Sequence, residues 1–68
     1  MKTYTFTFTS SQGRVKREVW KKFANVTQVI SFLRGAMTAM TFYMVEGEKL
    51  TCTIHYNGEL IWEESCTK

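Results

Sequence analysis

The sequence has no proline and no aspartate, and its four glycines lie far apart among 68 residues. No linker, repeat or low-complexity tract divides it, so we expect a single domain over residues 1–68. No apolar run approaches the ~20 residues that a membrane-spanning helix needs. No apolar signal segment opens the chain either, because Lys2 is followed by alternating threonines and aromatics. We therefore expect a soluble, cytoplasmic protein without a membrane partner.

Side chains suited to catalysis are also scarce. His55 is the only histidine, and on a strand it points away from the face of Cys52, which excludes a nucleophile–base pair. One histidine and two cysteines are too few for a four-ligand zinc site, and Glu63 and Glu64 are adjacent, so they face opposite ways. No glycine-rich phosphate loop or dinucleotide fingerprint is present. We expect no enzymatic activity, no metal and no cofactor, with Cys52 and Cys66 as reduced thiols.

The first half of the chain predicts strands followed by a helix. Residues 3–9 alternate threonine with aromatics, which is typical of a half-buried strand, and a turn at residues 10–13 follows. Residues 14–23 fit either a second strand or the start of one long helix, because their apolar spacing continues through residue 37 at helical periodicity. We favour the strand, since Asn25 is a strong helix N-cap and Gln28 can complete a capping box. The helix then covers about residues 26–36, ends near Gly35, and has Val26, Val29, Ile30, Leu33 and Met37 on its apolar face.

The second half predicts strands over residues 40–45, 50–56 and 59–64. Residues 46–49 form a turn, and Asn57-Gly58 is a strong signal for a type I′ hairpin. The predicted fold is ββαβββ, an α+β domain with one helix and an antiparallel sheet, and the alternative is βαβββ with a longer helix.

The hairpin turn also predicts which side chains share a face. A two-residue loop pairs Tyr56 with Glu59 and Ile54 with Ile61 on the core side. The other side then carries His55, Leu60 and Trp62, with Trp62 opposite Thr53. We interpret this second set as an apolar patch for a target or for homodimerisation.

The charges divide the sequence into a basic and an acidic part. Residues 1–36 carry seven Lys and Arg against one Glu, whereas residues 37–68 carry two Lys against five Glu. The basic side chains concentrate in residues 14–22, as Arg14, Lys16, Arg17, Lys21 and Lys22 around Trp20. As a strand, this segment places Arg14, Lys16, Trp20 and Lys22 on one face. Such a face suits an acidic protein surface, or a nucleic acid whose bases stack on Trp20. A solvated edge strand protected by lysines remains the third reading.

In outline, over the whole chain and in no single motif, the sequence resembles small accessory proteins of bacteriophages, including anti-CRISPR and other host-takeover inhibitors. The shared features are a very short, proline-free chain, a capped helix between hairpins and no catalytic set. The resemblance implies a protein that covers a surface of a host machine, and it assigns no functional residue. We expect a non-enzymatic interaction module that modulates or inhibits a protein target. The alternative is a small nucleic-acid-binding protein that uses residues 14–22.

Overall fold

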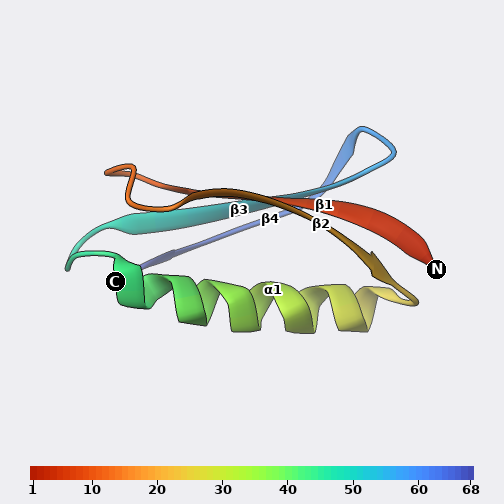
Figure 1. Cartoon of the computed structure of the whole chain (residues 1–68), viewed down its shortest axis with the longest axis horizontal. Helices are drawn as coiled ribbons and strands as arrows, with labels where there is room; N and C mark the ends of the chain where they lie inside the picture. The colour runs from red at the N-terminus through yellow and green to blue at the C-terminus, as the bar shows by residue number, and fades with distance from the viewer.

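The computed structural model describes all 68 residues and confirms the α+β class. The elements are β1 (Lys2–Ser10), β2 (Lys16–Phe23), α1 (Val26–Met40), a single 3-10 turn η1 (Thr41–Tyr43), β3 (Lys49–Tyr56) and β4 (Glu59–Thr67). The strands form one antiparallel sheet in the order β2-β1-β3-β4. Helix α1 lies along one face of this sheet, and no element covers the other face (Figure 1).

The strand prediction for residues 14–23 is confirmed, although β2 begins at Lys16. Residues 2–9 pair with residues 16–23, with Phe6 opposite Val19. Val15 is buried in the core, and Val19 and Phe23 pack against it. The alternative of one long helix from residue 15 is therefore wrong.

Helix α1 begins where the sequence predicts and ends later. The Gln28 N–H donates to Asn25 Oδ1 at 2.9 Å, and Gln28 Oε1 accepts from the Ala24 N–H at 3.0 Å. The helix then continues through Gly35, which is exposed with open space around it, to Met40. It continues because Met37 and Met40 extend its buried stripe onto the sheet. Val26 is not part of that stripe, since it is 61% exposed.

The extended helix removes one predicted strand. Residues 40–43 belong to α1 and η1, so the strand expected over residues 40–45 does not form. The fold is ββαββ, with four strands rather than five. Its 15-residue helix lacks the length and apolar character needed to cross a membrane.

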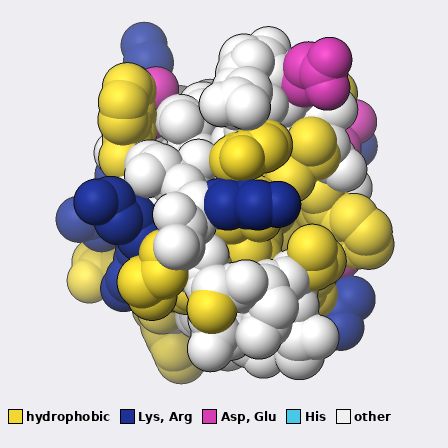
Figure 2. All heavy atoms as spheres, turned by 90° about the vertical axis from the view of Figure 1, so that its right-hand side faces the viewer, with side chains coloured by type: hydrophobic (Ala, Val, Ile, Leu, Met, Phe, Trp, Pro, Cys, Tyr) yellow, Lys and Arg dark blue, Asp and Glu magenta, His cyan; other side chains and the backbone are white.

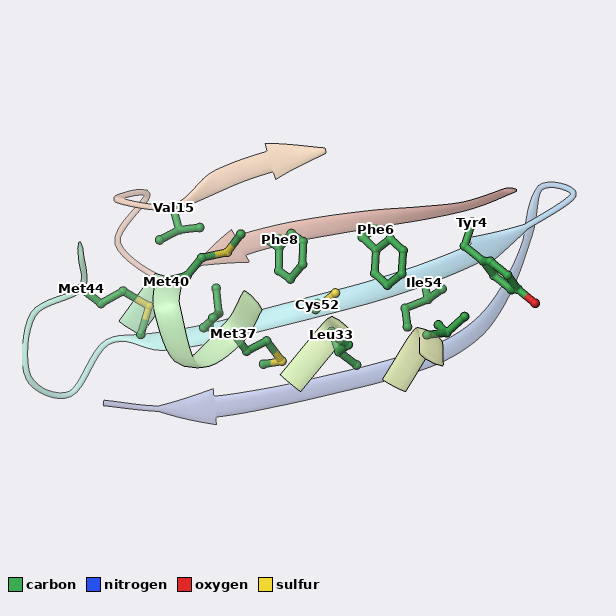
Figure 3. Packing of buried hydrophobic residues seen from close by; sticks show 12 residues of the cluster. Tyr4, Phe6, Phe8, Val15, Leu33, Met37, Met40, Met44, Cys52 and Ile54 are labelled. Atoms are coloured by element: carbon green, nitrogen blue, oxygen red, sulfur yellow. The ribbon is translucent and has the colours of Figure 1, made fainter. Parts of the chain in front are cut away.

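The core lies between α1 and the central strands. Phe6 and Phe8 from β1, Cys52 and Ile54 from β3, and Leu33 from α1 project into this space (Figure 3). All five side chains are fully buried. The core therefore lies on one side of the sheet only, and the side chains on the opposite face do not contribute to it.

The β3–β4 hairpin confirms the predicted turn but not the full register. Asn57 and Gly58 have φ of 53° and 80°, as a type I′ turn requires. Tyr56 pairs with Glu59, as predicted, but a bulge next in the ladder pairs Ile54 with Trp62 instead of Ile61. Every later residue of β4 is therefore shifted by one position, which exchanges its two faces.

A buried carboxylate holds the loops together at one end of the sheet. Glu48 is fully buried, and its Oε1 accepts a hydrogen bond from the Val45 N–H at 3.1 Å. Oε2 is buried without a hydrogen-bond partner. The Ser10 hydroxyl lowers the pKa of Glu48 most, and the N–H groups of Val45, Arg14 and Gln12 lower it further, against the opposing effect of burial. The Glu48 carboxylate thus bonds within the segment that leads into β3 and lies close enough to Ser10 and the β1–β2 loop for their polar groups to stabilise its charge.

Candidate binding face

The uncovered face of the sheet, which we call the open face, is built from alternate residues of all four strands. β1 contributes its threonines, since its aromatic residues point to the helix. The strand pairings place Trp20 opposite Thr5, Thr5 opposite His55, and His55 opposite Leu60. These four residues form one row across the sheet, here called the Trp20 row. With neighbouring strands about 4.8 Å apart, the row is about 14 Å long.

The two ends of the Trp20 row are apolar and accessible. Trp20 is 70% exposed and Leu60 is 55% exposed. Thr5 and His55 between them are half-buried and provide hydroxyl and imidazole groups. Short threonine side chains lose little rotamer freedom on contact, so a partner that binds this surface loses little free energy to side-chain ordering.

The rows on either side of the Trp20 row carry charges of both signs. On one side, Lys22 lies opposite Thr3. On the other side, a row runs from Glu18 through Thr7 and Thr53 to Glu63. A further row begins at Lys16 and crosses Thr9, Thr51 and Ser65. The open face is therefore a polar surface of mixed charge with apolar ends, without a strong field of one sign.

The basic segment does not converge on this face. Lys16, Trp20 and Lys22 lie on the open face as predicted, but Arg14 lies in the loop before β2. Arg17 and Lys21 belong to the helix side of β2, since they pair with Phe8 and Tyr4. There Lys21 Nζ lies 4.6 Å from the centre of the Phe32 ring. Only part of the predicted basic surface is thus available to one partner on the open face.

The predicted patch of His55, Leu60 and Trp62 is wrong in one member. The bulge turns Trp62 to the helix side, opposite Ile54, while Leu60 and His55 remain on the open face. Trp62 is 41% exposed, and its Nε1 donates to Glu64 Oε1 at 3.4 Å. The homodimer surface predicted from Leu60 with Trp62 therefore does not exist in that form. The sheet instead joins His55 and Leu60 to Trp20.

One feature near the basic segment was missed by the sequence analysis. A hollow of about 300 Å³ is lined by Arg14, Lys16, Arg17, Tyr43 and two apolar residues. Tyr43 is 75% exposed, and its neighbour Phe42 is 80% exposed. No local signal pointed to them, because residues 40–45 read as an alternating strand.

The histidine, cysteine and acidic side chains do not gather at one place in the structure. No group of three or more His, Cys, Asp or Glu side chains comes together in a way that could hold a metal ion. Both cysteines are free, and Cys52 is fully buried. Burial, with a smaller effect from the Glu64 charge, raises the pKa of the Cys52 thiol to about 12, so it is not a ready nucleophile. Searches of protein-family models, curated proteins and solved structures found no match to this chain.

Proposed function

We propose that the protein is a non-enzymatic interaction module that binds a protein target through the open face. The observation that carries this proposal is the Trp20 row, in which an exposed Trp and an exposed Leu end a stretch of polar side chains. Exposed aromatic anchors of this kind dominate the energy of protein interfaces, and polar groups around them fix the orientation. The charged rows beside it favour a target surface that also carries both signs. By covering that surface the protein modulates or inhibits its target, as do the bacteriophage proteins it resembles in outline.

The test compares two variants, each of which replaces one exposed aromatic residue by alanine, on the open face or on η1. Trp20→Ala removes the anchor of the open face, and Phe42→Ala removes a similarly exposed aromatic residue from η1. Each tagged protein is incubated with nuclease-treated lysate, and the captured proteins are quantified. A target of the open face is captured by the wild type and by F42A, and is depleted by W20A. After purification of that target, W20A is expected to weaken binding by about 2 kcal/mol or more, roughly thirtyfold.

Two results would refute this assignment. If F42A loses the target while W20A retains it, the binding surface lies on the helix side. If capture disappears with nuclease treatment, nucleic acid bridges the two proteins.

A second candidate function, nucleic-acid binding, rests on the hollow lined by Arg14, Lys16, Arg17 and Tyr43. Three cations beside an exposed aromatic ring can neutralise phosphates while a base stacks. Titration of labelled single-stranded DNA and RNA at several salt concentrations tests it. The slope of log K against log salt is expected at about −0.7 per phosphate neutralised, and it should flatten in R14A/R17A but not in R34A. Lack of binding, or binding insensitive to salt, removes this candidate.

A further inference from the structure

The two outer strands of the sheet each have one free edge. β2 pairs only with β1, and β4 pairs only with β3. Each therefore presents unpaired backbone N–H and C=O groups along its outward side, a ready template for another strand. These strands are eight and nine residues long, which is long for an unprotected edge.

The edges carry opposite charges. β2 contains Lys16, Arg17, Lys21 and Lys22 with a single Glu, whereas β4 contains Glu59, Glu63 and Glu64 with no Lys or Arg. In the end-on view, the largest group of basic side chains lies at the left, and an acidic side chain stands out at the upper right (Figure 2). The sheet order produces this separation, because the basic half of the sequence contains the outer strand β2 and the acidic half contains the outer strand β4. The opposite charges favour pairing of a β2 edge with a β4 edge.

Strand direction permits this arrangement without turning the sheet over. All neighbouring strands are antiparallel, so β2 and β4 run in opposite directions. A second copy placed beside the first, in the same orientation, would bring its β4 antiparallel to β2, with both helices on one side of a continuous sheet. Pairing β2 with β2 would instead place cations against cations, and β4 with β4 would place carboxylates against carboxylates.

One register between β2 and the β4 strand of a second copy places opposite charges next to each other on both faces of the sheet. In it, Lys21 on the helix side lies opposite Glu64 of a second copy, while Lys22 on the open face lies opposite Glu63 of that copy. Phe23 then lies opposite Trp62 of the second copy. Six residues of β2, 18–23, pair with residues 62–67, a usual strand length. Sliding the strands by two residues places Val19 opposite Glu64 and Trp20 opposite Glu63, so both charge pairs are lost. A slide of four places Arg17 opposite Glu64 but Glu18 opposite Glu63, so the charges on the open face repel.

We propose that copies of this protein associate head to tail, with the β4 edge of one copy added to the β2 edge of the next. Such an interface uses two different patches of each copy, so it leads to rings or to open chains of subunits rather than stopping at a symmetric dimer. Exposed charge pairs hold the register, so the association weakens as salt screens them. This inference concerns the sheet edges and is separate from the role of the open face.

Sedimentation velocity on the wild type and on charge-reversed variants tests the proposal. The wild-type mass should rise with protein concentration at about 0.05 M salt and fall at about 0.5 M salt. K21E/K22E alone and E63K/E64K alone should each weaken association by about tenfold or more, because each leaves two edges of one sign. Mixing these two variants should restore it, since each then supplies the edge that the other lacks. The four-substitution variant with both reversals should assemble by itself.

Controls separate loss of the edge from loss of the fold. K2E/K49E makes the same change in net charge as K21E/K22E, but on the central strands β1 and β3, and it should associate as the wild type does. E63K alone keeps the contacts of Glu64 with Arg34 and Trp62, and it should weaken association by a smaller factor than E63K/E64K. The circular dichroism spectrum of each variant should match that of the wild type, which checks that the variant is folded. A monomer at every concentration in low salt would overturn the proposal and identify the charges as protection of the edges. An association that survives K21E/K22E, or that the mixed variants fail to restore, would overturn it as well.

Discussion

Replacing Leu33 by alanine tests the packing that leaves one sheet face uncovered. Leu33 is fully buried at the middle of α1, where it meets the side chains of β1 and β3. A buried Leu→Ala change costs about 2–5 kcal/mol, the lost transfer energy plus the cavity left behind. At 0.05–0.15 kcal/mol per residue, a 68-residue domain has a free energy of unfolding of about 3–10 kcal/mol. The variant should therefore lose a large part of its stability, with its Tm falling by about 4–8 °C for each kcal/mol.

The measurement is urea unfolding followed by the far-ultraviolet circular dichroism of α1. Tryptophan fluorescence is a poorer probe, since Trp20 and Trp62 are already 70% and 41% exposed in the folded protein. Val26→Ala on the same helix is the matched control, because Val26 is 61% exposed and its loss should change stability by less than about 0.5 kcal/mol. Ile54→Val, a smaller truncation expected to cost about 0.5–1.5 kcal/mol, gives a measurable value even where Leu33→Ala unfolds the chain. Equal losses for Val26 and Leu33, or a loss below about 1 kcal/mol for Leu33, would show that α1 does not pack on the sheet through this stripe.

Three further predictions concern single side chains. Because the folded pKa of Glu48 is lower than its unfolded value near 4.5, its contribution to stability is complete above pH 4.5 and is lost as pH falls through the folded pKa. Urea unfolding of wild type and Glu48→Gln should therefore differ most at neutral pH and converge in acid; a constant difference would contradict this. Cys66, which is half-buried, should react with a thiol reagent in the folded protein, whereas Cys52 should react only on unfolding, because it is buried and its pKa is about 12; equal rates would be inconsistent. Trp62→Ala should cost less than the ~3–5 kcal/mol typical of a buried Trp, since its ring is partly exposed, and a larger loss in thermal melting would place it in the core.

Features set by local chemistry were predictable from the sequence. The alternation in residues 3–9, the cap at Asn25 and the turn at Asn57-Gly58 each depend on a few neighbouring residues, and the structure has all three. The strand at residues 16–23 was predictable because a strong helix start follows it. The placement of Trp20 on the open face follows from these features alone.

Features set by tertiary packing were not predictable in the same way. The sequence from Met40 to Met44 alternates like a strand, yet Met40 completes the buried stripe of α1, and burial decides the outcome. The bulge next to Ile54 has no local signature, and one inserted residue was enough to move Trp62 to the other side of the sheet. The candidate site was therefore half predictable: the sequence indicated Trp20, His55 and Leu60 as candidates, but not that one row of the sheet joins them.

The central position of β1 has a consequence for how the chain reaches its fold. One edge of β1 pairs with β2, which follows it closely in the sequence, but its other edge pairs with β3, joining Thr5 to His55 and Ser10 to Leu50. Two-stranded hairpins are at best marginally stable in water, so neither half of the chain should persist without the other. Folding must therefore bring distant segments together before the core forms, and such nonlocal pairing is slow. During synthesis, Phe6 and Phe8 stay without Ile54 and Cys52, the residues opposite them on β3, until residues 49–56 have left the ribosome, so the core cannot form before β3 emerges.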